Sequence, residues 1–280
     1  MRLGGPAPNP GDAASWIAAV QQLGYGAAYC PLSPGASSAE IARYARAAQD
    51  AGLVIAEVGA WSNPLSSAQA ERQAALDKCK ASLELAEQIG AVCCVNIAGS
   101  RGKQWDGPHP LNLTQETFDM IVAQTREIID DVAPRRAFYT LETMPWAFPN
   151  SPHSYLQLMQ AIDRPRFAVH LDIANITNSP ERFFGSAGLI RECFALLGPH
   201  VVSVHAKDIA LAPRLTVHLD EVRPGLGGFD FHALLREMDK LNPNTPLMLE
   251  HLPNEEEYRL AAEHVRQVAR EVAREVGGEA

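Results

Sequence analysis

The sequence is poor in cysteine and has no long hydrophobic segment. Its five cysteines are odd in number and none stands in a C-x-x-C spacing, so neither a disulfide framework nor a cysteine zinc site is indicated. No apolar run approaches the roughly 18 residues of a membrane span. The first residues also lack the apolar stretch of a secretory signal. We therefore expect a protein of the reducing cytoplasm.

Positively charged residues are also scarce relative to acidic ones. Lysine and arginine together count 24, aspartate and glutamate count 33, and the net charge is −9. A surface this acidic repels polyanions. We therefore expect no nucleic acid partner, and no membrane partner either.

What the chain does contain is an ordinary globular composition, 46% hydrophobic and 20% charged, arranged in one repeated alternation. Short β-branched or apolar runs, each predicting a strand, cover residues 2–4, 24–30, 53–58, 91–97, 137–143, 166–172, 200–206 and 246–251. Longer segments of helical spacing cover residues 12–22, 37–51, 66–89, 114–132, 152–163, 179–197, 230–241 and 254–275. Eight strands alternating with eight helices predict an α/β fold with a parallel sheet closed as a (β/α)8 TIM barrel. We expect a single barrel domain over residues 1–280.

Two connections after predicted strands are long. Residues 98–113 follow the 91–97 run and include Trp105, and residues 207–229 follow the 200–206 run. Long loops in a compact domain usually carry function, and barrel active sites form at the carboxyl ends of the strands. We therefore expect both loops to border the active site. Trp105 is either a packing residue or an aromatic face for a sugar ring.

Four successive predicted strands end in residues that bind metals. The 137–143 run delivers Glu142, the 166–172 run Asp172, the 200–206 run His205 and the 246–251 run Glu250. One such residue alone is more often a helix cap, a rim ion pair or a hydrogen-bonded core histidine. Three carboxylates converging on one rim would repel each other, however, and a divalent cation removes that repulsion. Three oxygen donors and one nitrogen favour manganese, with magnesium, cobalt or zinc as alternatives.

Three polar residues near these strand ends have two interpretations each. Lys207 points to the same side of its strand as His205, and it either binds a substrate oxygen or pairs with a neighbouring carboxylate. Asn96 lies near the end of the 91–97 run, and its side chain could face the pocket or point away from it. His170 either orients a metal ligand or is a polar core residue.

Recognisable motifs lie at the later strand ends and in the loop after the 200–206 run. They are Leu141-Glu142, His170-Leu-Asp172, Val204-His205-Ala-Lys207-Asp208, Arg223-Pro-Gly225-Leu-Gly227 and Leu249-Glu250. With these motifs, nearly the whole chain resembles the sugar isomerase/epimerase family with the xylose-isomerase-like barrel. That family includes ketose 3-epimerases, inosose dehydratase-type enzymes and, more distantly, AP endonuclease IV. The resemblance implies that the four strand-end residues bind one divalent metal, that the two glutamates are the acid/base pair, and that Arg223 contacts substrate.

The sequence departs from these relatives at two places. Many carry Asp-x-x-His after the sixth strand, where this chain has Asp172-Ile-Ala-Asn175; Asn175 is suited to hydrogen-bond a substrate hydroxyl. Endonuclease IV relatives supply two zinc ligands as Asp-x-His where this chain reads Thr216-Val-His218. We therefore expect neither a three-zinc cluster nor nuclease activity. His218 is either a substrate contact or a loop-packing residue.

Such a site predicts removal of a proton next to a carbonyl. A divalent cation chelated by substrate oxygens stabilises the enediolate, and two carboxylates of matched basicity exchange the proton. We expect a metal-dependent isomerase or epimerase of a free keto sugar, with Glu142 and Glu250 as acid and base. The alternatives are a lyase or dehydratase acting on an inosose or 3-keto-glycoside, and a non-catalytic sugar-binding barrel. The resemblance also implies a homo-oligomer, and the lack of a Rossmann-type glycine motif argues against a nicotinamide cofactor.

Overall fold

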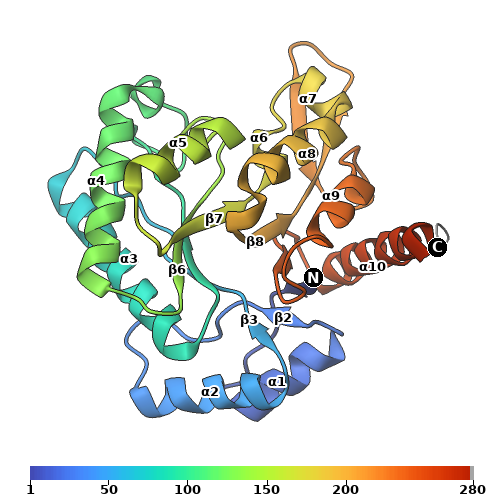
Figure 1. The fold of residues 1–280 in the computed structure, drawn as a ribbon, viewed down its shortest axis with the longest axis horizontal. Helices are drawn as coiled ribbons and strands as arrows, with labels where there is room; N and C mark the ends of the chain where they lie inside the picture. Colours follow the sequence, from blue (N-terminus) through green and yellow to red (C-terminus); the bar gives the residue numbers. More distant parts are fainter. Residues whose placement is uncertain (278–280) are drawn as a thin grey trace.

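A computed structural model describes residues 1–277, in which strands and helices alternate along the chain (Figure 1). The strands of the main sheet are β1 (Arg2–Gly5), β2 (Ala27–Ala28), β3 (Val54–Ile55), β4 (Glu57–Gly59), β5 (Cys93–Asn96), β6 (Phe138–Glu142), β7 (Phe167–Leu171), β8 (Val201–Ala206) and β11 (Pro246–Leu249). The α-helices are α1 (Ala13–Gln22), α2 (Ser38–Asp50), α3 (Gln69–Ile89), α4 (Gln115–Val132), α5 (Pro152–Ile162), α6 (Ile173–Ile176), α7 (Pro180–Phe184), α8 (Ser186–Leu197), α9 (Phe231–Met238) and α10 (Glu255–Gly277). Short 3-10 turns cover Pro110–Leu113 and Gly198–His200.

The main sheet is a nearly closed parallel barrel. Its strand order is β3-β2-β1-β11-β8-β7-β6-β5-β4, and each pair of neighbours runs parallel. The two end strands, β3 and β4, are separated in the chain by Ala56 alone. The Ala56 amide donates to Ala28 O of β2, and the Ala56 carbonyl accepts from the Cys93 amide of β5. The predicted α/β barrel is thus confirmed, with the predicted 53–58 strand divided between the two ends of the sheet.

Two further elements differ from the prediction. Residues 207–229 are not all loop, because β9 (Asp208–Ala212) and β10 (His218–Val222) form an antiparallel hairpin. The predicted 179–197 helix is divided into α7 and α8 at Gly185, a residue type with low helix propensity. The connection between the hairpin strands lacks the Asn-Gly or Asp-Gly pair that makes a hairpin visible in a sequence.

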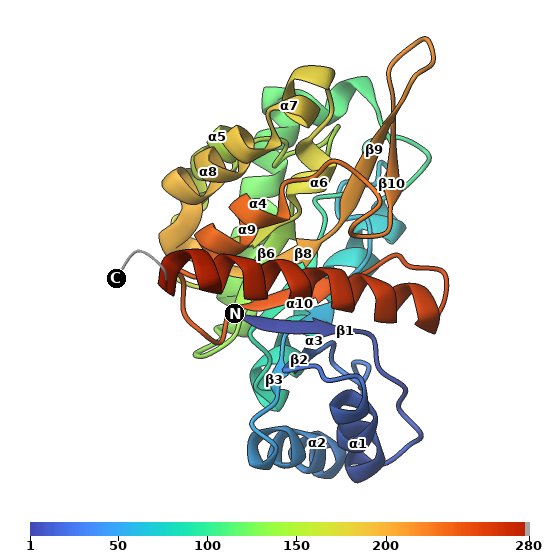
Figure 2. The same cartoon turned by 90° about the vertical axis from the view of Figure 1, so that its right-hand side faces the viewer.

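The long helices lie around the outside of the barrel, and the hairpin extends well beyond it (Figure 2). Helix α10 shows why these segments fold as helices. Its buried residues recur at helical spacing and form one apolar stripe against the barrel: Ala261, Ala262, Val265, Val268 and Val272. Within residues 1–277, no helix combines the length and apolar character needed to cross a bilayer.

Candidate metal and active site

Four metal-binding side chains meet at the carboxyl ends of the barrel strands. Glu142 is the last residue of β6, Asp172 caps α6 directly after β7, His205 is on β8, and Glu250 follows β11. One ligand atom from each lies within 4.8 Å of the others, and His205 Nδ1 is 2.7 Å from Glu250 Oε1 and 3.3 Å from Glu142 Oε1. The parallel strands therefore bring together the four residues that the sequence predicts as ligands.

The donor set of this cluster fits a divalent cation. Asp172 Oδ2 and Glu250 Oε1 are buried, and neither takes part in a well-formed hydrogen bond with any described residue. Both lie within ion-pair distance of Lys207 Nζ, but a buried carboxylate oxygen without a well-aligned hydrogen bond remains costly. Three carboxylates and one imidazole are ligands that manganese, magnesium, cobalt and zinc accept. A cation bound here would satisfy both oxygens.

Lys207 lies within the same cluster. Its side chain is almost completely buried, and its Nζ is 2.6 Å from Glu250 Oε1 and 2.9 Å from Asp172 Oδ2. Glu142 Oε1 and Glu221 Oε2 are each 3.8 Å from the same ammonium. The sequence left open whether Lys207 pairs with carboxylates or binds a substrate oxygen, and the described structure shows the pairing, which leaves substrate binding as a prediction. The ammonium offsets part of the negative charge of the cluster.

The surroundings shift the pKa values of the two glutamates in opposite directions. Burial raises the pKa of Glu142, and this effect outweighs the opposing influence of His205. Burial would also raise the pKa of Glu250, but the positive charges of His205 and Lys207 prevail and lower it to about 2. Neighbouring carboxylates raise the pKa of Lys207 despite its burial. Glu250 is thus held as a carboxylate, while Glu142 takes up a proton more readily.

An open cavity of about 520 Å³ leads to this cluster. Trp61 and Trp105 come from the loops after β4 and β5, and Tyr29 and Tyr258 complete its aromatic wall. Its polar groups come from Asp106, Glu142, Asn175, Lys207, Glu221, Glu250 and His251. The Asn175 side-chain amide donates to Glu142 Oε1 at 3.0 Å. Asn175 and Trp105, both expected to bind substrate, therefore line the cavity.

Two residues expected to contact substrate lie elsewhere. Asn96 is fully buried, with its Oδ1 accepting from the Ser62 amide and its Nδ2 facing Cys79 Sγ. The Arg223 side chain is paired with Glu257, with Nε 2.9 Å from a carboxylate oxygen. Neither lines the cavity described above. The Asn96 amide and the Arg223 guanidinium thus contact other protein groups outside the cavity.

Glu57 was not predicted as a site residue. It is on β4, is buried, and contacts the Nε2 atoms of His170 and His205. The sequence signal was a single carboxylate inside the apolar 53–58 run, where burial of a charge requires partners. Glu221, on the hairpin that the sequence did not predict, was missed because its proximity to Lys207 depends on that hairpin.

These features define a TIM barrel with a cluster of potential metal-binding side chains at the carboxyl ends of its strands. The chain belongs to the xylose isomerase-like TIM barrel family, whose model matches residues 17–268. This finding confirms the family that the strand-end motifs indicate. A comparison with curated protein sequences finds no match.

Solved structures with the same fold include proteins with different activities. D-psicose 3-epimerase from Clostridium cellulolyticum H10, solved with D-tagatose, is 16% identical, with a TM-score of 0.69 over 97% of this chain and 99% of that chain. Endonuclease IV from Thermus thermophilus is 16% identical, with a TM-score of 0.71 over 98% and 100%. A xylose isomerase-like TIM barrel protein from Mycobacterium smegmatis in complex with magnesium is 15% identical, with a TM-score of 0.67 over 96% and 95%. At these identities the similarity shows the shared fold, and the site itself must indicate the activity.

Proposed function

We propose that this protein is a divalent-metal-dependent isomerase or epimerase of an uncharged keto sugar. The observation that carries the proposal is the convergence of Glu142, Asp172, His205 and Glu250, whose ligand atoms lie within 4.8 Å of one another. Two of the buried carboxylate oxygens contact the Lys207 ammonium but make no well-aligned hydrogen bond. Manganese is our first choice of cation, with magnesium, cobalt or zinc as alternatives. A bound divalent cation would polarise the substrate carbonyl and stabilise the negative charge that develops beside it.

The two glutamates would move the proton. Glu250, held as a carboxylate, is suited to remove a proton from the carbon next to the carbonyl. Glu142 comes from β6, separated from β11 by β7 and β8 in the sheet, and is suited to carry a proton because burial raises its pKa. Return of a proton to the other face of the same carbon inverts that centre, whereas return to the adjacent carbon interconverts ketose and aldose. Asn175 and Lys207 would hold substrate oxygens.

The cavity favours an uncharged substrate. Lys207 is the only lysine or arginine among the described residues that line it, and carboxylates surround it. Phosphate binding usually draws on arginine, lysine or a helix N-terminus. Asp106, Glu221 and the two catalytic glutamates give the cavity a negative character instead. A free sugar or cyclitol fits this wall better than a sugar phosphate.

A lyase is the second candidate, and one feature favours it. A second cavity of about 370 Å³ shares Asn175, Lys207 and Glu221 with the first. Trp146 gives this second cavity an aromatic side, and hairpin residues including Val217 and Leu219 give it an apolar one. This space could receive the aglycone of a 3-keto-glycoside. Elimination would release that aglycone.

Deuterium exchange tests the proposed chemistry directly. The manganese-loaded protein would be incubated in D2O with free ketoses, inososes and 3-keto-glycosides, and products would be analysed by NMR and mass spectrometry. Metal-dependent deuterium uptake at a carbon next to a carbonyl is expected. An epimer or isomer keeps the substrate composition apart from deuterium, whereas a lyase product loses water or an aglycone. A metal-loaded protein that exchanges no proton in any of these substrates would contradict the proposal.

Metal binding should also stabilise the protein. A cation present at 100 times its dissociation constant is expected to add about 2.7 kcal/mol to the free energy of unfolding. Urea unfolding with and without manganese, followed by circular dichroism, measures this gain. Excess EDTA should remove both the gain and the deuterium exchange. Equal stability with manganese and with EDTA would count against a cation site in the folded protein.

Replacement of Trp105 by alanine is expected to raise KM about tenfold, with a smaller effect on kcat. Its indole is about 39% exposed and lies on the cavity wall, where an aromatic face suits the C–H surface of a sugar. Steady-state kinetics would measure the change. Phe184→Ala is the matched control, because that ring is 78% exposed and lies outside this cavity. Unchanged kinetics in Trp105→Ala would exclude sugar stacking on this residue.

We further propose a cytoplasmic homo-oligomer acting in carbohydrate metabolism. All five cysteines are free thiols, as a reducing compartment would keep them. The homo-oligomer is what the resemblance to the sugar isomerase/epimerase family implies. Light scattering would measure the mass in solution.

A further inference from the structure

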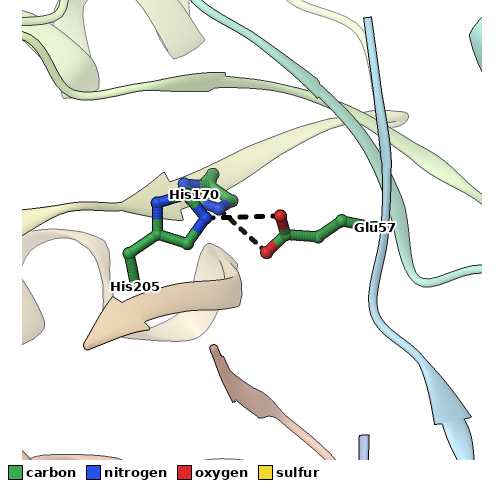
Figure 3. A group of neighbouring side chains, drawn as sticks. All are labelled: Glu57, His170 and His205. Carbon is green, nitrogen blue, oxygen red and sulfur yellow. Dashed lines mark hydrogen bonds and ion pairs between the residues drawn. The ribbon is translucent and has the colours of Figure 1, made fainter. Parts of the chain in front are cut away.

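A second buried polar group lies beneath the four predicted ligands. Glu57 reaches the barrel interior from β4, and its Oε1 is 3.0 Å from His170 Nε2 and 2.5 Å from Ser203 Oγ. Its Oε2 is 3.3 Å from His205 Nε2. Figure 3 shows this carboxylate facing both imidazole rings. All four side chains are buried.

Glu57 and His205 belong to opposite parts of the barrel. In the sheet order, β5, β6 and β7 lie between β4 and β8. The contact therefore spans the interior rather than joining neighbouring strands. A carboxylate in such a place needs donors, and the described structure provides Ser203 and the two imidazoles. Each of these contacts fixes the direction in which a side chain points.

The two nitrogens of His205 consequently face different groups. Nδ1 faces the carboxylates of Glu142 and Glu250, whereas Nε2 faces Glu57. A neutral imidazole carries a proton on one nitrogen and a lone pair on the other. Carboxylates face both nitrogens, and the shortest contact is at Nδ1. A cation bound by the four-residue cluster would need the Nδ1 lone pair, and the proton on Nε2 would then be held by Glu57.

The same atoms could be read as a second cation site, because one ligand atom each from Glu57, His170 and His205 lies within 4.8 Å of the others. A cation bound there would require the lone pair of His205 Nε2. His205 would then present a proton, not a lone pair, to Glu142 and Glu250 through Nδ1. Ser203 Oγ also occupies one oxygen of Glu57. The arrangement therefore suits a hydrogen-bonded support better than a second metal.

We propose that Glu57 is a positioning residue that sets the tautomer and ring orientation of His205 for metal binding. It acts through His205 and touches neither substrate nor cation. His170 and Ser203 in turn hold the Glu57 carboxylate in place. This inference rests on the metal centre of the proposed function and is independent of the substrate. Supporting carboxylates of this kind typically contribute 10- to 100-fold to metal affinity.

The first test is the metal affinity of Glu57→Gln. Glutamine has a similar shape, but its amide nitrogen cannot accept the hydrogen bonds that both imidazoles offer. We expect manganese to bind about 10- to 100-fold more weakly, measured by the EPR signal of free manganese during titration. Circular dichroism and urea unfolding would establish that the variant is folded. Glu221→Gln is the matched control: it removes a carboxylate close to Lys207 without touching His205, so it reports the loss of charge alone.

The second test is independent of any variant at Glu57. Side-chain 15N NMR of the magnesium- or zinc-loaded wild type should show a proton on His205 Nε2, with the signal assigned by its loss in His205→Asn. A proton on Nδ1 instead would overturn the proposal. Wild-type affinity in folded Glu57→Gln, or equal losses in Glu57→Gln and Glu221→Gln, would also overturn it. Two ions per wild-type chain, with one lost in Glu57→Gln, would identify a second metal site instead.

These outcomes are separable from those that test the proposed function. If the wild type binds metal but exchanges no substrate proton, the proposed activity is wrong. The role of Glu57 is then decided by the affinity and NMR data alone. If Glu57→Gln matches the wild type while exchange proceeds, only the positioning role fails. A wild type that binds no divalent metal would overturn both.

Discussion

Glu142→Gln is expected to lower kcat by about 10²- to 10⁴-fold, the usual contribution of a positioned acid or base. Glutamine keeps an oxygen where Glu142 Oε1 approaches His205, so the fold and part of the metal affinity should survive. It cannot carry the proton that the raised pKa of Glu142 allows this residue to hold. The rate of product formation would be measured at saturating manganese, with metal content determined separately.

The control for this prediction is Glu221→Gln. Glu221 lines the same cavity and lies 3.8 Å from Lys207, but it is outside the group of four ligands. Its loss should reduce kcat less than about tenfold. If Glu142→Gln with bound manganese retained more than a tenth of the wild-type kcat, Glu142 would not be a proton carrier. A large loss of kcat in Glu221→Gln would then identify another route for the proton.

The meeting of the four ligands could be anticipated because strand geometry is regular. Residues at the carboxyl ends of parallel strands share one rim, and Glu142, Asp172, His205 and Glu250 each end or follow such a strand. Their convergence therefore required only the strand boundaries and the barrel topology. The family match confirms that barrel.

Glu57 could not be placed in the same way, because its partners lie across the barrel. Its strand was predicted, and the isolated carboxylate was visible, but the sequence does not reveal which side chains meet inside a closed sheet. Asn96 is the opposite case, a residue that was predicted to bind substrate but is buried in the core. It ends β5 as expected, yet contacts with Ser62 and Cys79 use its amide within the core. Side-chain direction at a strand end depends on twist and local pairing as well as on alternation.

The hairpin was missed for a different reason. Strands β9 and β10 pair with each other and not with the barrel, so the βα alternation that predicts the other strands does not include them. Their pairing places Glu221 near Lys207 and gives the second cavity one of its walls. The connection after β8 therefore contributes to the candidate site, as its length suggests, but through a structure that the sequence did not predict.

Lys207→Met is expected to lower the free energy of unfolding of the metal-free protein by about 3–5 kcal/mol, as loss of one partner from a buried ion pair does. The variant leaves Asp172 and Glu250 without the ammonium that lies 2.9 Å and 2.6 Å from their oxygens. Manganese should bind the variant at least about tenfold more tightly, because Lys207 both repels a cation and occupies the oxygens that the cation would use. Urea unfolding in EDTA and manganese titration measure the two effects.

Lys80→Met is the matched control, since Lys80 also contacts two carboxylates, those of Glu127 and Asp131, but at the surface. Its loss should cost less than about 1 kcal/mol and leave manganese affinity unchanged. If Lys207→Met is less stable than the wild type in EDTA but binds manganese more tightly, the ammonium and the cation compete for one group of carboxylates. A Lys207→Met protein as stable as the wild type in EDTA would instead mean that a proton balances the cluster, and Glu142, whose pKa burial raises, is the group that would hold it.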